Sequence, residues 1–137
     1  MRGLALCLVI SLGLAGPALA DEAAAPDVSA VIQAQIDAFL ADDLDTAFTY
    51  ASPGIRRMFR TPERFGEMVQ RGYPMVWRPD TVRYLDRREH PGGGVIQRVM
   101  ITDQEGRLHV LDYLMLPGDA GWNIGGVELL RAPSAGA

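Results

Sequence analysis

Cysteine is almost missing from this 137-residue chain, in which Cys7 is the single example. A disulfide needs two thiols and a thiolate zinc site needs several, so both are excluded. Histidine is scarce too, because His90 and His109 are the whole supply and fall in different predicted elements. We therefore predict no metal site and no bound cofactor, and hydrophobic packing has to stabilise the fold.

Lysine is absent as well, so every basic side chain is an arginine. The 13 arginines are outnumbered by 17 acidic residues, which gives a net charge of −4 and predicts no nucleic-acid partner. The charges are unevenly spread, because residues 52–90 hold nine arginines against five acids. Two interpretations stay open: an arginine-lined anion site, or arginines that pair with the acidic first third or are solvated on the surface.

Long apolar runs are lacking after residue 20, and the run near the start is short. Met1-Arg2-Gly3 precedes an apolar segment over residues 4–14, and the sequence Pro17-Ala18-Leu19-Ala20 follows. A positive start, a short apolar core and a small-residue pattern are typical of a secretory signal peptide. The segment is shorter than the roughly 20 residues that span a bilayer. We therefore predict cleavage after Ala20, export, and no stable membrane anchor.

The predicted domain organisation follows from these limits. Residues 1–20 are the signal peptide, 21–27 a flexible leader, 28–131 one folded domain and 132–137 a disordered tail. A chain of this length buries enough surface for one hydrophobic core but too little for two domains.

Helical periodicity dominates the first half of the chain. Apolar residues recur every three or four positions over residues 28–40, behind a capping Asp27. Three further helices are predicted, each after a dipeptide that can cap or open a helix: Asp42-Asp43, Ser52-Pro53 and Thr61-Pro62. The inward residues of the last two are predicted as Ile55, Met58 and Phe59, then Phe65, Met68 and Val69.

The last of these helices should end at Gly72 through a positive φ angle. Residues 73–79 contain two prolines and should form a broken connection or an edge strand. Four extended runs then follow: Thr81–Arg87, Val95–Thr102, Leu108–Leu116 and Trp122–Leu130. Because these runs are separated by turn sequences of hairpin length, we predict an α+β fold with helices packed on one face of a curved, four-stranded antiparallel meander.

This order of elements, ending in Gly121-Trp122-Asn123-Ile124, resembles the nuclear transport factor 2-like superfamily. That superfamily has the cystatin-like cone of ketosteroid isomerase and polyketide cyclases. Several segments are in addition similar to an exported bacterial domain family of unknown function: Tyr50-Ala51-Ser52-Pro53, Met58-Phe59, Phe65, Met68-Val69, Tyr73-Pro74 and Arg78-Pro79. The resemblance implies a cavity between the first helix and the sheet, homodimerisation through the sheet, and a bacterial periplasm as the location. It carries over no catalytic residues.

Asp112 is the candidate site residue that the strand pattern singles out. It shares a strand face with four aliphatic residues, Leu108, Val110, Leu114 and Leu116. If this face lines the cavity, desolvation would raise the pKa of Asp112 and make it a general base or a hydrogen-bonding acid. The alternative is an ion pair with Arg98 or Arg83 on an adjacent strand. Tyr113 and His109 point to the opposite face.

Tyr84, Arg98 and Trp77 complete the candidate ligand-binding residues. Tyr84 and Arg98 are possible assistants of Asp112, whereas Trp77 lies in the proline-broken connection as an exposed aromatic. Together with Tyr73 and Trp122 it would line an apolar pocket or mark an interface.

Because the residues form no acid–base constellation, the favoured function is that of an exported, non-catalytic module. It would bind a small apolar or anionic molecule or a partner protein. Two alternatives stay open: a small isomerase, cyclase or dehydratase that uses Asp112, and a structural homodimerisation domain.

Overall fold

The structure is a computed structural model that describes residues 27–131. The predicted signal peptide with its cleavage after Ala20, the leader as far as residue 26 and the predicted tail lie outside the described residues.

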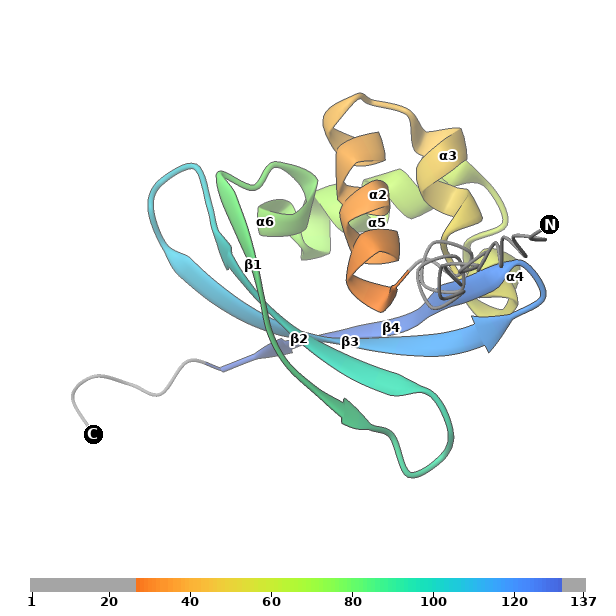
Figure 1. Cartoon of the computed structure of the whole chain (residues 1–137). Helices are drawn as coiled ribbons and strands as arrows, with labels where there is room; N and C mark the ends of the chain where they lie inside the picture. Colours follow the sequence, from red (N-terminus) through yellow and green to blue (C-terminus); the bar gives the residue numbers. More distant parts are fainter. Residues whose placement is uncertain (1–26, 132–137) are drawn as a thin grey trace, which may run out of the picture.

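The helices come first along the chain and the strands follow (Figure 1). The helices are α2 (Val28–Leu40), α3 (Leu44–Thr49), α4 (Pro53–Phe59), α5 (Pro62–Gly72) and α6 (Pro74–Trp77). The strands are β1 (Thr81–Glu89), β2 (Val95–Thr102), β3 (Leu108–Gly118) and β4 (Gly121–Leu130). They form one four-stranded sheet in the order β1-β2-β3-β4, with every neighbouring pair antiparallel. The predicted α+β fold with a meander sheet is therefore confirmed.

The helix starts lie where the capping residues predict them. The side chain of Asp43 accepts a hydrogen bond from the Thr46 amide at 3.1 Å, and Thr61 accepts one from the Arg64 amide at 3.2 Å. Ser52 caps α4 in the same way, and its partner is the Ile55 amide at 3.3 Å. These bonds satisfy amides that have no partner inside the helix.

The segment after α5 differs from its prediction. Gly72 is the last residue of α5 rather than a positive-φ cap, and the chain leaves the helix at Tyr73 with φ −136°. Pro74 then begins the short helix α6, which packs Met75 and Val76 into the core. The prediction of a broken connection or an edge strand is wrong here, because proline at a first helical position loses no hydrogen bond and can start a helix.

The sheet has an inner face, which packs under the helices, and an outer face, which none of the described helices covers (Figure 1). The inner face carries side chains with no exposed surface, among them Val99, Ile101, Leu111, Tyr113 and Met115. Against them pack Ile32, Ile36 and Phe39 of α2, which are equally inaccessible. Within the described part of the chain, no helix is long and apolar enough to cross a membrane.

Close contacts attach the start of α4 to the sheet and α5 to α3. The Ser52 amide donates to the Ile124 carbonyl, and the Ile124 amide donates to the Tyr50 carbonyl, both at 2.8 Å. They attach the start of α4 to β4. On α5, Gly66 lies so close to α3 that an added Cβ would sit 2.7 Å from the Leu44 side chain. Glycine therefore lets α5 pack closely on α3.

Candidate ligand-binding cavity

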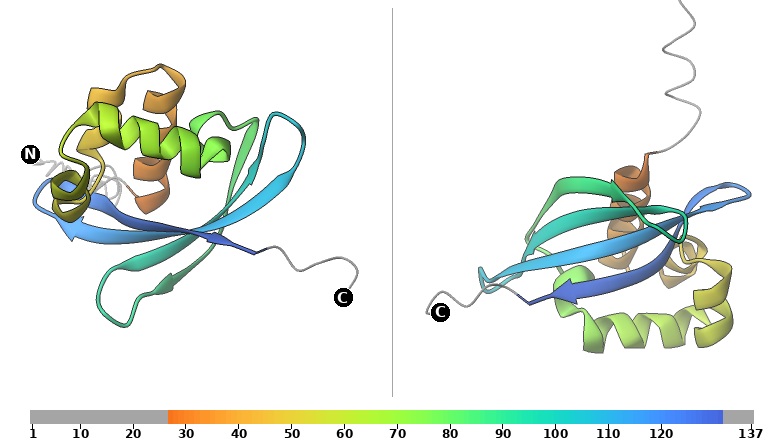
Figure 2. Two further views of the ribbon diagram at one scale, coloured as in Figure 1. Left: turned by 180° about the vertical axis from the view of Figure 1, so that it is seen from behind. Right: turned by 90° about the horizontal axis from the view of Figure 1, so that it is seen from below.

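An apolar cavity of about 300 Å³ lies between the helices and the inner face of the sheet. Helix α2 contributes Gln35 and Phe39, and α6 contributes Val76. Strands β3 and β4 supply the floor through Tyr113 and residues 124–127. Figure 2 shows α5 running alongside β4, with α4 at one end of it, so these elements surround the cavity.

The residues of α4 and α5 that line the cavity recur at the same helical spacing. Ile55, Met58 and Phe59 line the cavity from α4, and Phe65, Met68 and Val69 line it from α5. Both sets follow i, i+3, i+4 spacing, which places three side chains on one face of a helix. The predicted inward faces of these two helices are therefore the cavity walls.

Met58 is far more exposed than its predicted inward position implies. Its side chain is 72% exposed although it lines the cavity, and α4 as a whole buries no residue. Met58 therefore lies at the rim of the cavity, where α4 borders solvent.

Polar groups are few in this cavity. The Gln35 side chain donates to the Ala47 carbonyl at 3.1 Å, and the Tyr73 hydroxyl donates to the Val127 carbonyl at 3.0 Å. Tyr113 also lines the cavity, and its buried hydroxyl has no hydrogen-bond partner among the described residues. Burial raises the pKa of Tyr113, so its phenol stays protonated at neutral pH. The lining is thus almost entirely apolar.

Asp112 does not line this cavity. It shares a face with Leu108, Val110, Leu114 and Leu116 as expected, but that face is the outer one. The prediction that Asp112 points between the first helix and the sheet is therefore wrong. The strand pattern shows which residues share a face, whereas packing of the helices decides which face becomes the inner one.

Two arginines surround the Asp112 carboxylate instead. Arg98 donates from Nε to Oδ1 at 2.9 Å and from Nη2 to Oδ2 at 3.1 Å, and Arg88 donates to Oδ2 at 2.9 Å. The hydrogen bonds from Arg98, helped by the one from Arg88, hold the pKa of Asp112 below its usual range despite burial. Of the alternatives weighed from the sequence, the ion pair with Arg98 is therefore the one observed.

Tyr84 and Trp77 also lie away from the cavity lining. Tyr84 reaches α2 from β1 and donates its hydroxyl to Gln33 at 2.8 Å. Trp77 packs against Phe39 with ring centroids 5.5 Å apart, and the Arg78 guanidinium lies 4.5 Å from the Trp77 ring centroid. Hence none of the candidates Asp112, Arg98, Tyr84 and Trp77 lines the cavity.

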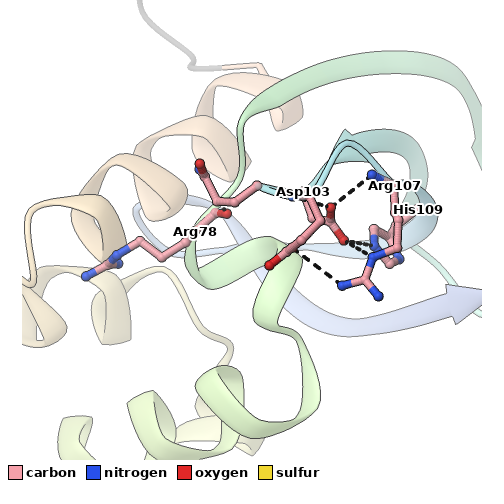
Figure 3. A network of polar contacts seen from close by, with 6 residues as sticks. Arg78, Asp103, Arg107 and His109 are labelled. Atoms are coloured by element: carbon pink, nitrogen blue, oxygen red, sulfur yellow. Dashed lines mark hydrogen bonds and ion pairs between the residues drawn. The ribbon is translucent and has the colours of Figure 1, made fainter.

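A second polar cluster centres on Asp103, at the turn between β2 and β3 (Figure 3). Its carboxylate contacts His109 Nε2 at 2.8 Å and Arg107 Nε at 3.0 Å. It also accepts hydrogen bonds from the Glu105 and Arg107 amides, both at 2.9 Å. The bond with His109, followed by those with the two amides and the Arg107 guanidinium, holds the pKa of Asp103 far below its usual range.

The Asp103 cluster has the character of a structural support. Its carboxylate is fully occupied by groups of its own turn and by His109 of β3, and Arg78 nearby donates to the Phe39 carbonyl at 2.8 Å. Within residues 27–131 no three His, Cys, Asp or Glu side chains come together as metal ligands. The cavity is therefore the stronger candidate site.

The residues that line the cavity carried a partial signal in the sequence. The apolar faces of α4 and α5 were readable from their spacing, and Tyr73 from its place among the aromatics. Gln35 and Tyr113 carried no such signal, because one lies in an apolar helix stripe and the other in a strand that is apolar on both faces.

Comparison with known proteins identifies the family of the chain. The family model described as "Domain of unknown function (DUF4864)" matches residues 21–137. No curated protein and no solved structure matches the chain.

Proposed function

Because the chain belongs to the DUF4864 family, whose description names no activity, we propose a function from the geometry of the cavity. The protein is a non-catalytic module that binds a small apolar molecule between its helices and its sheet.

The cavity carries this proposal. The space of about 300 Å³ opens to solvent at its rim, and its volume is similar to that of other hollows on the described residues. What distinguishes it is its lining, which is almost entirely methionine, phenylalanine, tyrosine and aliphatic side chains. Apolar cavities of roughly 300–1,000 Å³ are the usual sites of small ligands.

A catalytic function has less support. Asp112 is held as a carboxylate by two arginines on the outer face, and a carboxylate with a lowered pKa is a weak general base. Neither Asp112 nor Arg98 lines the apolar cavity. The geometry therefore favours binding over the isomerase, cyclase or dehydratase alternative.

Two wider proposals accompany this function. The helices followed by a meander support membership of the nuclear transport factor 2-like superfamily. The basic, apolar and small-residue pattern of residues 1–20 supports export to a bacterial periplasm.

The test is uptake of 1-decanol, measured by isothermal titration calorimetry. We expect the protein to bind 1-decanol with a dissociation constant on the order of 10–100 μM. Ile55→Trp fills the cavity from α4, a helix that buries no residue and can adjust, and should weaken binding at least about tenfold.

The matched control is Leu108→Trp, which introduces the same side chain at a position that is 60% exposed and outside the cavity. It should leave the affinity unchanged. Absence of binding to the unmodified protein, or equal binding by Ile55→Trp, would contradict the proposed function.

A homodimer is the second candidate, and the outer sheet face favours it. This face carries partly exposed apolar residues around the Arg88–Asp112–Arg98 network: Ile96, Met100, Val110, Leu114, Leu116 and Leu130. A second copy is one partner that would cover them, and the oligomeric state in solution tests this.

A further inference from the structure

We infer that the ligand of the cavity is an amphipathic anion. Its apolar body occupies the cavity, and its acidic group stays at the rim, where Arg64 and Arg71 of α5 bind it. This inference rests on the proposed function and names the class of ligand for the same site.

The position of Met68 places the two arginines at the rim. Met68 lines the cavity and is partly buried. Arg64 precedes it by four residues and Arg71 follows it by three in the same helix. Residues at these spacings are neighbours on a helix surface, with Cβ atoms roughly 5–6 Å apart. Two flexible guanidinium side chains therefore flank the side chain that borders the cavity.

Both arginines are exposed and lack an ionic partner. Within residues 27–131 no carboxylate lies within ion-pairing distance of Arg64 or Arg71. Other arginines do have such partners: Arg78, Arg87, Arg88, Arg98 and Arg107. The acidic first third supplies Asp42 and Asp27 to Arg78 and Arg87, but supplies none to the arginines of α5.

The other charged residues of α4 and α5 also contribute to the local charge. Helix α4 carries Arg56 and Arg57, is followed by Arg60 and has no acidic residue. These three arginines line a separate surface hollow beside Phe48 and Pro53 rather than the cavity itself. On α5, Glu63 directly precedes Arg64, whereas Glu67 follows Arg64 by three residues and precedes Arg71 by four, so it neighbours both arginines on the helix surface. No ion pair within the described residues joins Glu67 to either arginine. Residues 53–72 together hold five arginines and two glutamates, so this part of the surface is cationic in a chain whose net charge is −4.

An apolar cavity with a cationic rim selects one kind of molecule. A charged group does not enter the cavity, because its desolvation would be uncompensated there. At the rim it keeps part of its hydration and gains charge-assisted hydrogen bonds from guanidinium groups, which match the geometry of carboxylate and phosphate. A long-chain carboxylate or alkyl phosphate fits both parts, whereas an amphipathic cation is repelled.

The experiment compares decanoate with 1-decanol, which share an alkyl chain and differ in charge. Isothermal titration calorimetry of the unmodified protein should give an affinity for decanoate about tenfold higher than for 1-decanol. The double variant Arg64→Gln/Arg71→Gln should weaken decanoate binding about five- to tenfold and leave 1-decanol within about twofold. Added salt should weaken decanoate binding only.

The matched control is Arg83→Gln. Arg83 is an exposed arginine on the outer side of β1, and it too has no carboxylate partner within the described residues. This variant should bind both ligands like the unmodified protein. An equal loss in Arg83→Gln would show a general charge effect and overturn the inference.

The outcomes separate this inference from the proposed function. If 1-decanol binds but decanoate binds no better, or if the double variant loses nothing, the acidic ligand is wrong and the apolar site stands. If 1-decanol does not bind at all, the proposed function itself fails.

Sedimentation with phosphatidylglycerol vesicles distinguishes a free amphipathic acid from a membrane lipid. We expect decanoate to bind in free solution while the protein stays in the supernatant. Sedimentation with vesicles without any binding of decanoate would overturn the inference.

Discussion

Asp112 is a buried carboxylate that links three strands across the outer face of the sheet. Its own strand is β3, Arg98 comes from β2, and Arg88 comes from β1. Its side chain is 7% exposed, whereas the arginines keep 32% and 47% of theirs. Removing the charge of Asp112 would leave two guanidinium groups without their common partner, which costs more than the loss of an exposed ion pair.

We therefore predict that Asp112→Asn lowers the free energy of unfolding at pH 7 by about 1–2 kcal/mol. Its binding of 1-decanol should stay within about twofold, because the cavity is on the other face of the sheet. Urea denaturation and calorimetry measure the two quantities. Asp119→Asn, in the exposed turn before β4, is the control and should change neither.

The lowered pKa of Asp112 determines how the stabilisation by this residue changes with pH. The folded pKa of Asp112 lies below the ordinary value of 3.8, so the unfolded chain takes up the proton first as the pH falls. The stabilisation is therefore complete above about pH 5 and is lost as the pH falls through the folded pKa. The difference between Asp112→Asn and the unmodified protein should shrink below about pH 4. If Asp112→Asn is as stable as the unmodified protein but no longer binds 1-decanol, Asp112 has the functional role that the sequence suggested.

At the scale of elements, the hairpin between β1 and β2 depends on one close approach. Gly94 has φ +93°, and a Cβ there would lie 2.4 Å from the Met115 carbonyl oxygen of β3. Gly93 has a similar φ of +98°, but a Cβ added there would have no neighbouring atom within 4 Å. A residue other than glycine would therefore be strained by the positive φ at both positions, but only at position 94 would its Cβ also meet a backbone atom.

We predict that Gly94→Ala lowers the free energy of unfolding by about 2–4 kcal/mol, because it adds a backbone clash to the strain of a positive φ. Gly93→Ala should cost only about 1 kcal/mol, for the strain alone. Thermal and urea denaturation of both variants measure the difference. Equal costs would mean that the hairpin moves away from β3 and relieves the clash.

Element boundaries were readable wherever a local signal existed. Asp43, Ser52 and Thr61 each cap a helix through their own side chains, and such a bond needs only neighbouring residues. Helix α6 was missed, because Pro74 is compatible both with an extended connection and with a helix start. Its docking against the core, through Met75 and Val76, resolves the choice.

At the scale of the whole molecule, the two sheet faces differ in what covers them. The inner face meets the helices and the cavity, while the outer face keeps partly exposed apolar residues around the buried Asp112 and its two arginines. A dimer through this face would bury those residues against their symmetry mates.

If the protein forms this dimer, Leu114→Arg should convert it to a monomer, since it places a charge at the middle of the outer face. Leu129→Arg is the control, because Leu129 is 44% exposed on β4 and faces the opposite side. Light scattering coupled to gel filtration at about 100 μM protein measures the mass. A monomeric mass for the unmodified protein would contradict the dimer.

The candidate site was only partly predictable from the sequence, because the strand pattern does not show which face of the sheet meets the helices. Spacing identified the apolar sides of α4 and α5, and these line the cavity. Strand β3 carries apolar residues on both faces, with Leu111 and Met115 on one and Val110 and Leu114 on the other. Its pattern could not tell which face meets the helices, so Asp112 was assigned to the wrong side.

The sequence by itself determined what depends on near neighbours: the helix starts, the alternation of the strands, the hairpin turns and hence the α+β order. The tertiary structure alone decided which face of the sheet is inner, where the cavity lies and which arginines of the described residues keep no carboxylate partner. The reason is physical. Caps and turns act over a few residues, whereas a cavity is the space left between elements far apart in the chain, and its shape exists only once they have packed.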